Sequence, residues 1–445
     1  MLSVNVKIIE ELKKFLLKVS RDQELLSVFR FSEKDFTRNR KLPFEKLVLL
    51  IAKLCKKTLS FEIEEFFEQI GVPIPCSVSA YSQQRMKLDG RFYYWWNMVL
   101  WQTFYAIGGE KIKRWKGYRL IAGDGSTIAL INNTSLGSFF GGQSNGHSFG
   151  AAARTYYAYD VLNNLILFPW IVPYRSSEVE MAYQTVEGLG SQGQDMLMIY
   201  DRNFCSYKMA ALHLWQEKEV KFIIRAKESF NQVRSFIESG QPAAIIELKP
   251  TCEAIQSLKK SGYIITYGTT IKVRLVRVEL PESVEVLMTN LWEDEGHAIS
   301  GFKELYALRW GIETNISLQK NILQLESFSG LTVKAVTQDF YATVFIANLH
   351  NLLIKPAQQT IVTAPAGARR KHEQKINNNK SFGYLKKSIV RLFIEKDTAY
   401  ILKRLHDLFI KNTLPVRKGR SFHRAIKNKK SNSKFRTFSN FKPAY

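Results

Sequence analysis

Three carboxylate side chains stand where a sheet and a helix could bring them together. Asp124 follows an apolar run at 118–122, and Asp201 follows directly after a second apolar run at 196–200. Glu313 lies in a long segment with helical periodicity. Carboxylate oxygens are the ligands that Mg²⁺ and Mn²⁺ prefer, so a metal site is one interpretation. The alternative is structural, because aspartate after a strand commonly caps a turn or a helix.

The helix expected around Glu313 carries a second pattern. At about 100° per residue, four polar side chains fall in one narrow stripe: Tyr306, Arg309, Glu313 and Lys320. The adjacent face is apolar and consists of Leu305, Leu308, Ile312 and Ile316. Such a helix can pack on a sheet by its apolar side and present the stripe at the packing edge. The alternative is a solvated helix face with an Arg-to-Glu pair four residues apart.

The segments between residues 118 and 224 follow a definite order. Three strand-like runs come first, at 118–122, 151–159 and 165–172. A helix, a buried strand, a second helix and a second buried strand then follow, at 178–189, 196–200, 207–216 and 220–224. This order predicts a ribonuclease-H-like α/β fold with a mixed sheet. In that sheet the first and fourth strands are neighbours, so Asp124 and Asp201 would lie side by side. This is costly for like charges unless a cation lies between them.

The stripe also resembles a known motif. Its spacing, Tyr306-x-x-Arg309-x-x-x-Glu313-x-x-x-x-x-x-Lys320, resembles the Tyr-Arg-Glu-Lys signature of DDE transposases of the bacterial insertion-sequence four family. The segments beginning at Asp124 (Asp-Gly-Ser-Thr) and at Tyr200 (Tyr-Asp-Arg-Asn-Phe) resemble the first and second acidic motifs of that family. Segments 35–42 and 79–88 are also similar, so the resemblance covers about residues 35–355. The family usually has glycine where Asn203 stands, and asparagine tolerates a left-handed backbone better than most residues.

The resemblance implies a catalytic role for the three acids. Asp124, Asp201 and Glu313 would hold two divalent ions, Mg²⁺ with Mn²⁺ as a substitute. Two such ions, about 3.5 to 4 Å apart, would activate the attacking oxygen and stabilise the leaving oxygen while phosphodiesters are cut and joined. The phosphates beside the scissile bond would be held by the rest of the stripe, Tyr306, Arg309 and Lys320.

Other candidates for DNA contact carry weaker signals. Arg225 and Lys227 end the strand at 220–224 on the expected active-site edge, where they would contact DNA or act as solvated strand-end charges. Trp292 would stack on a base displaced from a DNA end, although core packing is the commoner role for such a residue. His147 is a lone histidine in a glycine-rich stretch, which favours a structural role over a ligand.

Residues 1 to about 115 have helical patterns and form the first expected domain. Pro43 suits a first helical turn before the apolar run at 44–54, and the segment 73–76 interrupts the helical pattern. A further helix beginning at residue 78 carries Arg85 and Lys87. These two residues would contact DNA or belong to a solvated helix face.

Positive charge is concentrated toward the C-terminus. The chain has 64 lysine and arginine residues against 40 aspartate and glutamate residues, a formal net charge of +24. Residues 355–445 hold 23 basic and 4 acidic residues, a net charge of +19, which leaves +5 for residues 1–354. From Lys411 onward there are 11 basic residues and no acidic one. We interpret this tail as an arm for DNA phosphates, and the alternative is a solvated tail.

Cysteine usage and hydropathy exclude other classes of protein. The four cysteines lie far apart, without a C-x-x-C pair, which argues against a zinc site or a disulfide framework and indicates a reducing compartment. The N-terminal segment lacks the features of a signal peptide. A long apolar stretch without charged residues, 92–109, contains polar residues and predicts a buried helix rather than a membrane span. We expect a bacterial cytoplasmic protein associated with the nucleoid, without a membrane partner.

The chain is expected to have five regions. In order they are a helical N-terminal DNA-binding domain (1–115), the first part of the catalytic domain (116–228), a β-rich insertion (229–299), the second part with the Glu313 helix (300–358), and a basic helical C-terminal region (359–445). Strands are expected in the insertion at 244–248, 263–267, 271–280 and 284–289. Long helices are expected at 302–325, 337–353 and 383–410.

The resemblance implies a transposase that binds the terminal inverted repeats of its element, cleaves there, and joins the 3′-hydroxyls to target DNA. Its partners would be double-stranded DNA and a second copy of the chain, since the family implies a homodimer on paired ends. Two alternatives stay open. One is a catalytically inactive, sequence-specific DNA-binding protein, and the other is a nuclease of the same fold without strand transfer.

Overall fold

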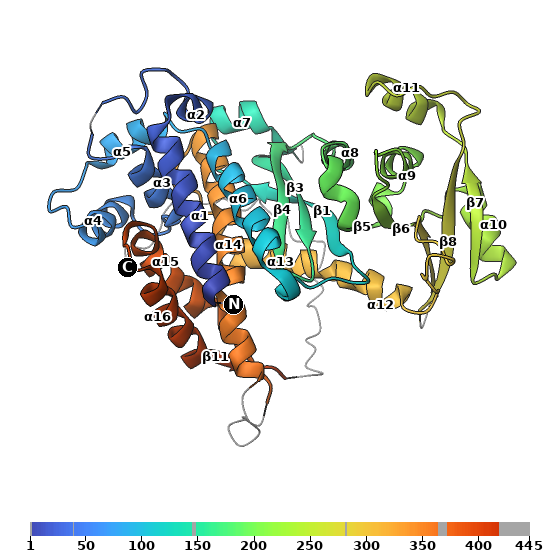
Figure 1. Cartoon of the computed structure of the whole chain (residues 1–445). Helices are drawn as coiled ribbons and strands as arrows, with labels where there is room; N and C mark the ends of the chain where they lie inside the picture. The colour runs from blue at the N-terminus through green and yellow to red at the C-terminus, as the bar shows by residue number, and fades with distance from the viewer. Residues whose placement is uncertain (1, 39, 145–147, 281–282, 364–371, 418–445) are drawn as a thin grey trace.

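The computed structural model describes residues 2–38, 40–144, 148–280, 283–363 and 372–417. A mixed sheet occupies the middle, a bundle of helices lies at one end, and a smaller unit of strands and helices lies at the other (Figure 1). His147 and the basic tail from residue 418 lie outside the described residues.

The central sheet has the connectivity predicted from the element order. Its five core strands are β1 (Arg119–Ala129), β3 (Phe149–Asp160), β4 (Leu165–Pro173), β5 (Met196–Tyr200) and β6 (Lys221–Arg225). β3 pairs antiparallel with both β1 and β4, whereas β5 pairs parallel with β1, and β6 pairs parallel with β5. The spatial order β4, β3, β1, β5, β6 confirms the ribonuclease-H-like fold.

Helices cover both faces of this sheet, because side chains alternate between the faces along each strand. On one face, Leu120 and Ala122 of β1 belong to apolar clusters that include Phe302, Leu305 and Ile312. On the other face, Ile121 belongs to the cluster that contains the apolar sides of two helices. These are α8 (Glu178–Glu187) and α9 (Tyr207–Leu214).

The insertion extends the central sheet. Its strands are β7 (Ala243–Leu248), β8 (Ile271–Glu279) and β9 (Val284–Thr289), and β9 pairs antiparallel with β6. It also contains two helices that we did not expect, α10 (Asn231–Ser239) and α11 (Cys252–Lys260). The strand expected at 263–267 is wrong: the segment is a loop in which Ile264 is 99% exposed. The residue types of this segment alternate as in a strand, but no strand of the described sheet pairs with it.

The helix with the polar stripe is nearly continuous. It consists of α12 (Phe302–Ala307), the 3₁₀ turn η4 (Leu308–Trp310) and α13 (Gly311–Asn321), in place of the single helix expected at 302–325. The next helix, α14 (Val333–Val362), runs through Pro356 instead of ending before it.

The N-terminal and C-terminal helices pack together around α14. Trp96 stacks on Phe345 of α14 with ring centroids 4.1 Å apart, and the ring centroid of Phe393 lies 4.9 Å from that of Trp96. The single helix expected at 383–410 is two helices, because Asp397 caps the second by accepting from the Tyr400 N–H. The helices of this bundle are α1 (Leu2–Arg21), α2 (Gln23–Val28), α3 (Phe44–Ala52), α4 (Leu59–Gln69), α5 (Val78–Arg85), α6 (Arg91–Ile107), α15 (Asn378–Ile394) and α16 (Thr398–Lys411).

The remaining elements are short. They are η1 (Gly109–Lys111), α7 (Thr134–Phe140), β2 (Gly142–Ser144), η2 (Gly190–Asp195), η3 (Arg202–Phe204), and the paired strands β10 (Gln374–Ile376) and β11 (Thr413–Pro415). The apolar stretch at 92–109 forms α6, whose Phe92, Trp96 and Leu100 are buried, as predicted. Within the described ranges, no helix is long and apolar enough to cross a membrane.

Candidate active site

Asp124 and Asp201 lie at the same edge of the sheet. Gly123 of β1 pairs with Tyr200 of β5 in parallel register, and each aspartate is the next residue of its strand path. Asp201 ends β5 and accepts at Oδ1 from the Asn203 N–H at 2.7 Å, which caps the turn η3. The two carboxylates therefore come from neighbouring parallel strands, as the fold prediction required.

The environment of Asp124 disfavours its charged form. Burial, with smaller contributions from the nearby carboxylates of Asp201 and Glu178, raises the pKa of Asp124 to about 6. The Gly125 N–H, which donates to Asp124 Oδ1 at 2.8 Å, and the Arg309 guanidinium oppose this pKa shift only in part. The hydrogen bond and the arginine therefore do not offset the cost of burying the charged form of Asp124.

Arg309 is the cation closest to this charge. It lies in η4, is 6% exposed, and its Nη1 is 3.9 Å from Asp124 Oδ2. Its Nη2 donates to Glu313 Oε1 at 3.2 Å, one helical turn further on. Its Nε is buried and has no hydrogen-bond partner among the described residues. The guanidinium is held loosely between two carboxylates.

Glu313 lies in the first turn of α13 and points at Arg309. Its side chain is 44% exposed, more than twice the 20% of Asp124. Within the described part of the chain, no group of three or more histidine, cysteine, aspartate or glutamate side chains is arranged to hold a metal ion. The three predicted ligands share one region, but Glu313 is engaged by Arg309 rather than by a shared site.

Tyr306 and Lys320 lie at opposite ends of the stripe. Burial raises the pKa of Tyr306 to about 12, and Arg309, Glu285, Arg225 and Asp201 are all near enough to influence it. Lys320 donates to the Thr127 carbonyl of β1 at 2.6 Å, and burial lowers its pKa. The stripe therefore follows β1 past Asp124, as its periodicity predicted.

Sequence reasoning missed a further carboxylate, Glu178. It begins α8 on the opposite face of the sheet from Glu313, and its Oε1 accepts from Asn203 Nδ2 at 2.6 Å. A Cβ on Gly125 would overlap the carboxylate of Glu178 and lie 2.9 Å from its Cβ. The glycine after Asp124 was the available signal, since glycine in a strand often marks a close approach.

The turn after Asp201 differs from the one expected. Asn203 is not among the residues with positive φ, so the position does not require a left-handed backbone. The asparagine instead uses its side chain to reach Glu178. Its carbonyl accepts from Lys227 Nζ at 3.4 Å.

Arg225 and Lys227 lie at the same edge of the sheet as Asp201. Together they line a cavity of about 460 Å³ between the ends of β5 and β6, α10 and β9. Arg225 Nη1 pairs with Glu285 Oε1 at 2.8 Å. The structure thus places both residues beside the predicted active site, and their contact with DNA stays a prediction.

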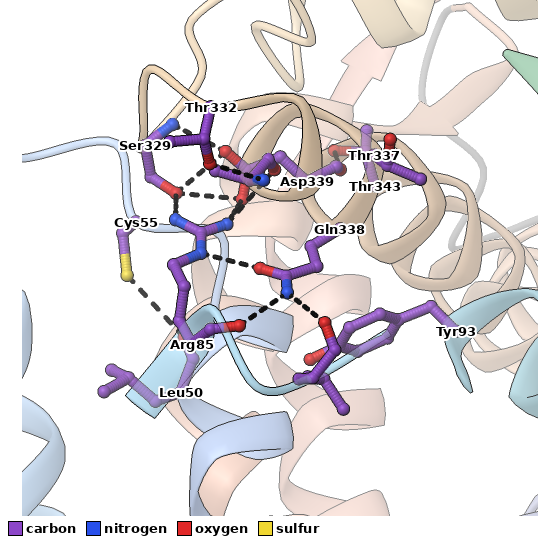
Figure 2. A network of polar contacts seen from close by, with 12 residues as sticks. Leu50, Cys55, Arg85, Tyr93, Ser329, Thr332, Thr337, Gln338, Asp339 and Thr343 are labelled. Atoms are coloured by element: carbon purple, nitrogen blue, oxygen red, sulfur yellow. Dashed lines mark hydrogen bonds and ion pairs between the residues drawn. The ribbon is translucent and has the colours of Figure 1, made fainter. Parts of the chain in front are cut away.

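Arg85 requires a correction. It is 3% exposed, and Figure 2 shows its guanidinium enclosed by α14 and the loop before it. It donates to Gln338 Oε1 at 2.7 Å, Ser329 Oγ at 2.7 Å and Asp339 Oδ1 at 2.8 Å. Every one of these partners belongs to the protein interior, so the expectation that Arg85 contacts DNA is wrong. It fixes α5 to α14 and to the loop before α14.

Trp292 also requires a correction, because it lies at the wrong edge of the sheet. β9 runs antiparallel to β6, and the chain leaves β9 where Lys221 Nζ donates to the Asn290 carbonyl at 3.3 Å. This is the amino end of β6, whereas Asp201 follows the carboxyl end of β5. Trp292 is half-buried there and does not face the predicted active site.

Lys87, the second basic residue expected to contact DNA from the N-terminal helices, is half-buried and donates to Gln84 Oε1 at 3.0 Å.

Comparison with known proteins identifies the family. Residues 115–349, more than half of the 445 residues, match the transposase DDE domain. The chain belongs to this family. The DDE domain thus begins just before β1 and ends inside α14, and it contains both aspartates and the whole stripe.

The chain is also similar to solved structures. One of them is a cryo-EM structure of a piggyBac transposase synaptic complex with hairpin DNA, at 9% identity and a TM-score of 0.41. The similarity covers 94% of this chain and 84% of that one. No curated protein matches the chain.

Proposed function

We propose that the chain is a transposase of the insertion-sequence four type. It binds the terminal inverted repeats of its element, cleaves DNA there, and joins the 3′-hydroxyls to target DNA. The observation that supports this most is the pair Asp124 and Asp201 on neighbouring parallel strands, with the Tyr-Arg-Glu-Lys stripe packed over them. The membership in the transposase DDE domain family supports the same chemistry.

The donor set fits divalent metal ions. Asp124 is buried beside a second carboxylate, and its pKa of about 6 means that the protein does not offset the cost of burying its charged form, which a bound cation would favour. Asp124, Asp201 and Glu313 would hold the ions, Mg²⁺ or Mn²⁺, by hard carboxylate oxygens. Two bound ions supply activation of the attacking oxygen and stabilisation of the leaving oxygen.

Arg309 and Lys320 would bind the DNA backbone. Arg309 has a loose pair with Asp124, a single hydrogen bond to Glu313, and an unused Nε, so a phosphate can offer it better partners than it has now. Moving to a phosphate would release Glu313 toward the aspartates. Lys320 is held beside β1 by the Thr127 carbonyl, where it can act as a point charge.

DNA is a partner that matches the positive net charge of the chain. A formal charge of +24 attracts a polyanion, and Arg225 and Lys227 line the cavity beside Asp201. We propose a homodimer on paired DNA ends as the working form.

The test is incubation of the purified chain with linear DNA that carries the ends of its element, together with Mg²⁺ and a target plasmid. Cleavage at the ends followed by insertion is the expected result. Cleavage alone would indicate a nuclease without strand transfer, and end binding without cleavage would indicate an inactive DNA-binding protein. Light scattering of the complex with its DNA ends tests the dimer.

A further inference from the structure

Glu178 approaches the predicted active site from the face opposite to Glu313. Its helix, α8, begins at this residue after Ser177, whose side chain caps the helix by accepting from the Glu180 N–H. The Glu178 carboxylate occupies the space that a Cβ of Gly125 would fill. A glycine directly after Asp124 is therefore what allows α8 to place a carboxylate against β1.

Asn203 connects this carboxylate to Asp201. Its Nδ2 donates to Glu178 Oε1 at 2.6 Å, and its backbone N–H donates to Asp201 Oδ1 at 2.7 Å. The side chain of Asn203 is thus anchored at one end, while its backbone orients a predicted metal ligand. A hydrogen bond to an ionised acceptor is stronger than a neutral one, which makes Glu178 an effective anchor.

We propose that Glu178 is a positioning residue for Asp201, acting through Asn203. The proposal rests on the proposed function, since Asp201 matters as a ligand only if the chain binds divalent ions there. Groups that orient a metal ligand by hydrogen bonds are worth about 10-fold to 100-fold in metal affinity. Asn203 is exposed, so we expect the lower end of that range.

An ordinary helix-start role for Glu178 can be separated from this one. A carboxylate in the first turn stabilises a helix through its dipole, and Glu180 lies in the same first turn. Glu180 is exposed to solvent. Glu180→Ala therefore removes a comparable helix contribution and leaves the Glu178 contact intact.

The experiment measures Mn²⁺ binding to the full-length chain by isothermal titration calorimetry, without DNA. Glu178→Ala should weaken Mn²⁺ affinity about 10-fold, and Asn203→Ala should weaken it equally. The double variant should bind no more weakly than either single variant, because both act through one contact. Glu178→Gln keeps an acceptor oxygen and should recover most of the affinity, which a direct ligand would not allow. Glu180→Ala should bind like the unmodified chain.

The variant Asp201→Asn distinguishes a failure of the proposed metal site from a failure of the positioning role of Glu178. If Asp201→Asn binds Mn²⁺ as well as the unmodified chain, the metal site itself is wrong. If Asp201→Asn loses binding but Glu178→Ala matches Glu180→Ala, only the positioning role is overturned. Additive losses in the double variant would also overturn the path through Asn203. Should Glu178→Ala fail to fold, the surface variant Asn203→Ala decides the question, since unchanged affinity there contradicts the proposal.

Discussion

Among the described arginines that are buried beside aspartates, Arg85 and Arg309 have sharply different surroundings. Arg85 is 3% exposed and pairs with Asp339, and Arg309 is 6% exposed and lies near Asp124. Arg85 donates to Gln338, Ser329 and Asp339 at 2.7 to 2.8 Å. Arg309 makes one hydrogen bond, at 3.2 Å to Glu313, and keeps Nε unsatisfied among the described residues.

The two aspartates respond in opposite directions. Burial alone would raise the pKa of Asp339, but Arg85 and Ser329 more than compensate, and the pKa is lowered. At Asp124, burial prevails over Arg309 and the pKa rises to about 6. The pair of Arg85 and Asp339 is therefore complete within the protein, whereas Arg309 does not offset the burial of Asp124. A buried charge without full compensation is costly, and such sites concentrate where function needs them.

The largest expected effect concerns Asp201, which follows the strand next to that of Asp124. Asp201→Asn should slow cleavage of a DNA end by at least about 10³-fold, because a neutral amide holds a divalent cation poorly and metal ions supply several kcal/mol of transition-state stabilisation. Binding to the end should stay close to that of the unmodified chain. Single-turnover cleavage and electrophoretic mobility shift on the same samples measure both. Full cleavage by Asp201→Asn would remove this residue from the active site.

Breaking the complete pair of Arg85 and Asp339 should instead lower the stability of the protein. Arg85→Ala should lower the free energy of unfolding by about 3 to 5 kcal/mol, the range for breaking a buried ion pair and leaving one charge unpaired. Arg91→Ala is the control: Arg91 is 65% exposed and pairs with Asp89, so its loss should cost less than about 1 kcal/mol. Urea unfolding measures both. Unchanged stability together with lost DNA binding would return Arg85 to the DNA-contacting residues.

Arg309→Ala should slow cleavage by about 10²-fold, which corresponds to the loss of one charged clamp on a phosphoryl transition state. The thermal midpoint should fall less than in Arg85→Ala, because Arg309 makes a single hydrogen bond, to Glu313, and only a distant pair with Asp124. Arg309→Lys should restore part of the rate, since lysine cannot offer two parallel donors.

Arg391→Ala provides the matched control for that change. It removes another arginine-to-glutamate pair at the same spacing, with Glu395, in a helix remote in sequence from the DDE domain. Its cleavage rate should equal that of the unmodified chain. If Arg309→Ala behaves like Arg391→Ala, the stripe is an ordinary helix surface.

Local pattern was enough to predict much of this architecture. The strand and helix order between 118 and 224 predicted a sheet in which Asp124 and Asp201 are neighbours, and the pairing of β1 with β5 confirms that placement. Helical periodicity placed Arg309 and Glu313 on one stripe, and their hydrogen bond agrees with it. These features depend on residues close in sequence or on a known connectivity.

Features that depend on distant contacts escaped prediction. Arg85 resembles a surface arginine in sequence, yet its partners lie 244 to 254 residues away on the chain. Glu178 touches Asn203, 25 residues further on, and only the close approach at Gly125 hinted at it. The sequence does not reveal that β9 runs antiparallel to β6, so it could not show that Trp292 lies at the edge of the sheet opposite to Asp201. Local periodicity carries no information on such pairings.

The pH dependence of the free energy of unfolding should differ between Asp124 and Asp339. A carboxyl whose folded pKa is raised stabilises the fold only while it is protonated, so Asp124 contributes stability below about pH 4 that is lost as the pH rises through about 6. A shift of about two pKa units corresponds to at most about 3 kcal/mol. Asp124→Asn should therefore raise the free energy of unfolding by about 2 kcal/mol at pH 7.5 without divalent ions, and by almost nothing at pH 4. Asp339→Asn should instead lower the free energy of unfolding at pH 7.5. The lowered pKa of Asp339 means that its ionised form stabilises the fold above the unfolded pKa, and this contribution is lost in acid. Urea unfolding of both variants across this pH range is the measurement. If Asp124→Asn destabilises the protein at pH 7.5 as Asp339→Asn does, then Arg309 compensates Asp124 as fully as Arg85 compensates Asp339, and the sheet edge has no excess charge for a metal ion to balance.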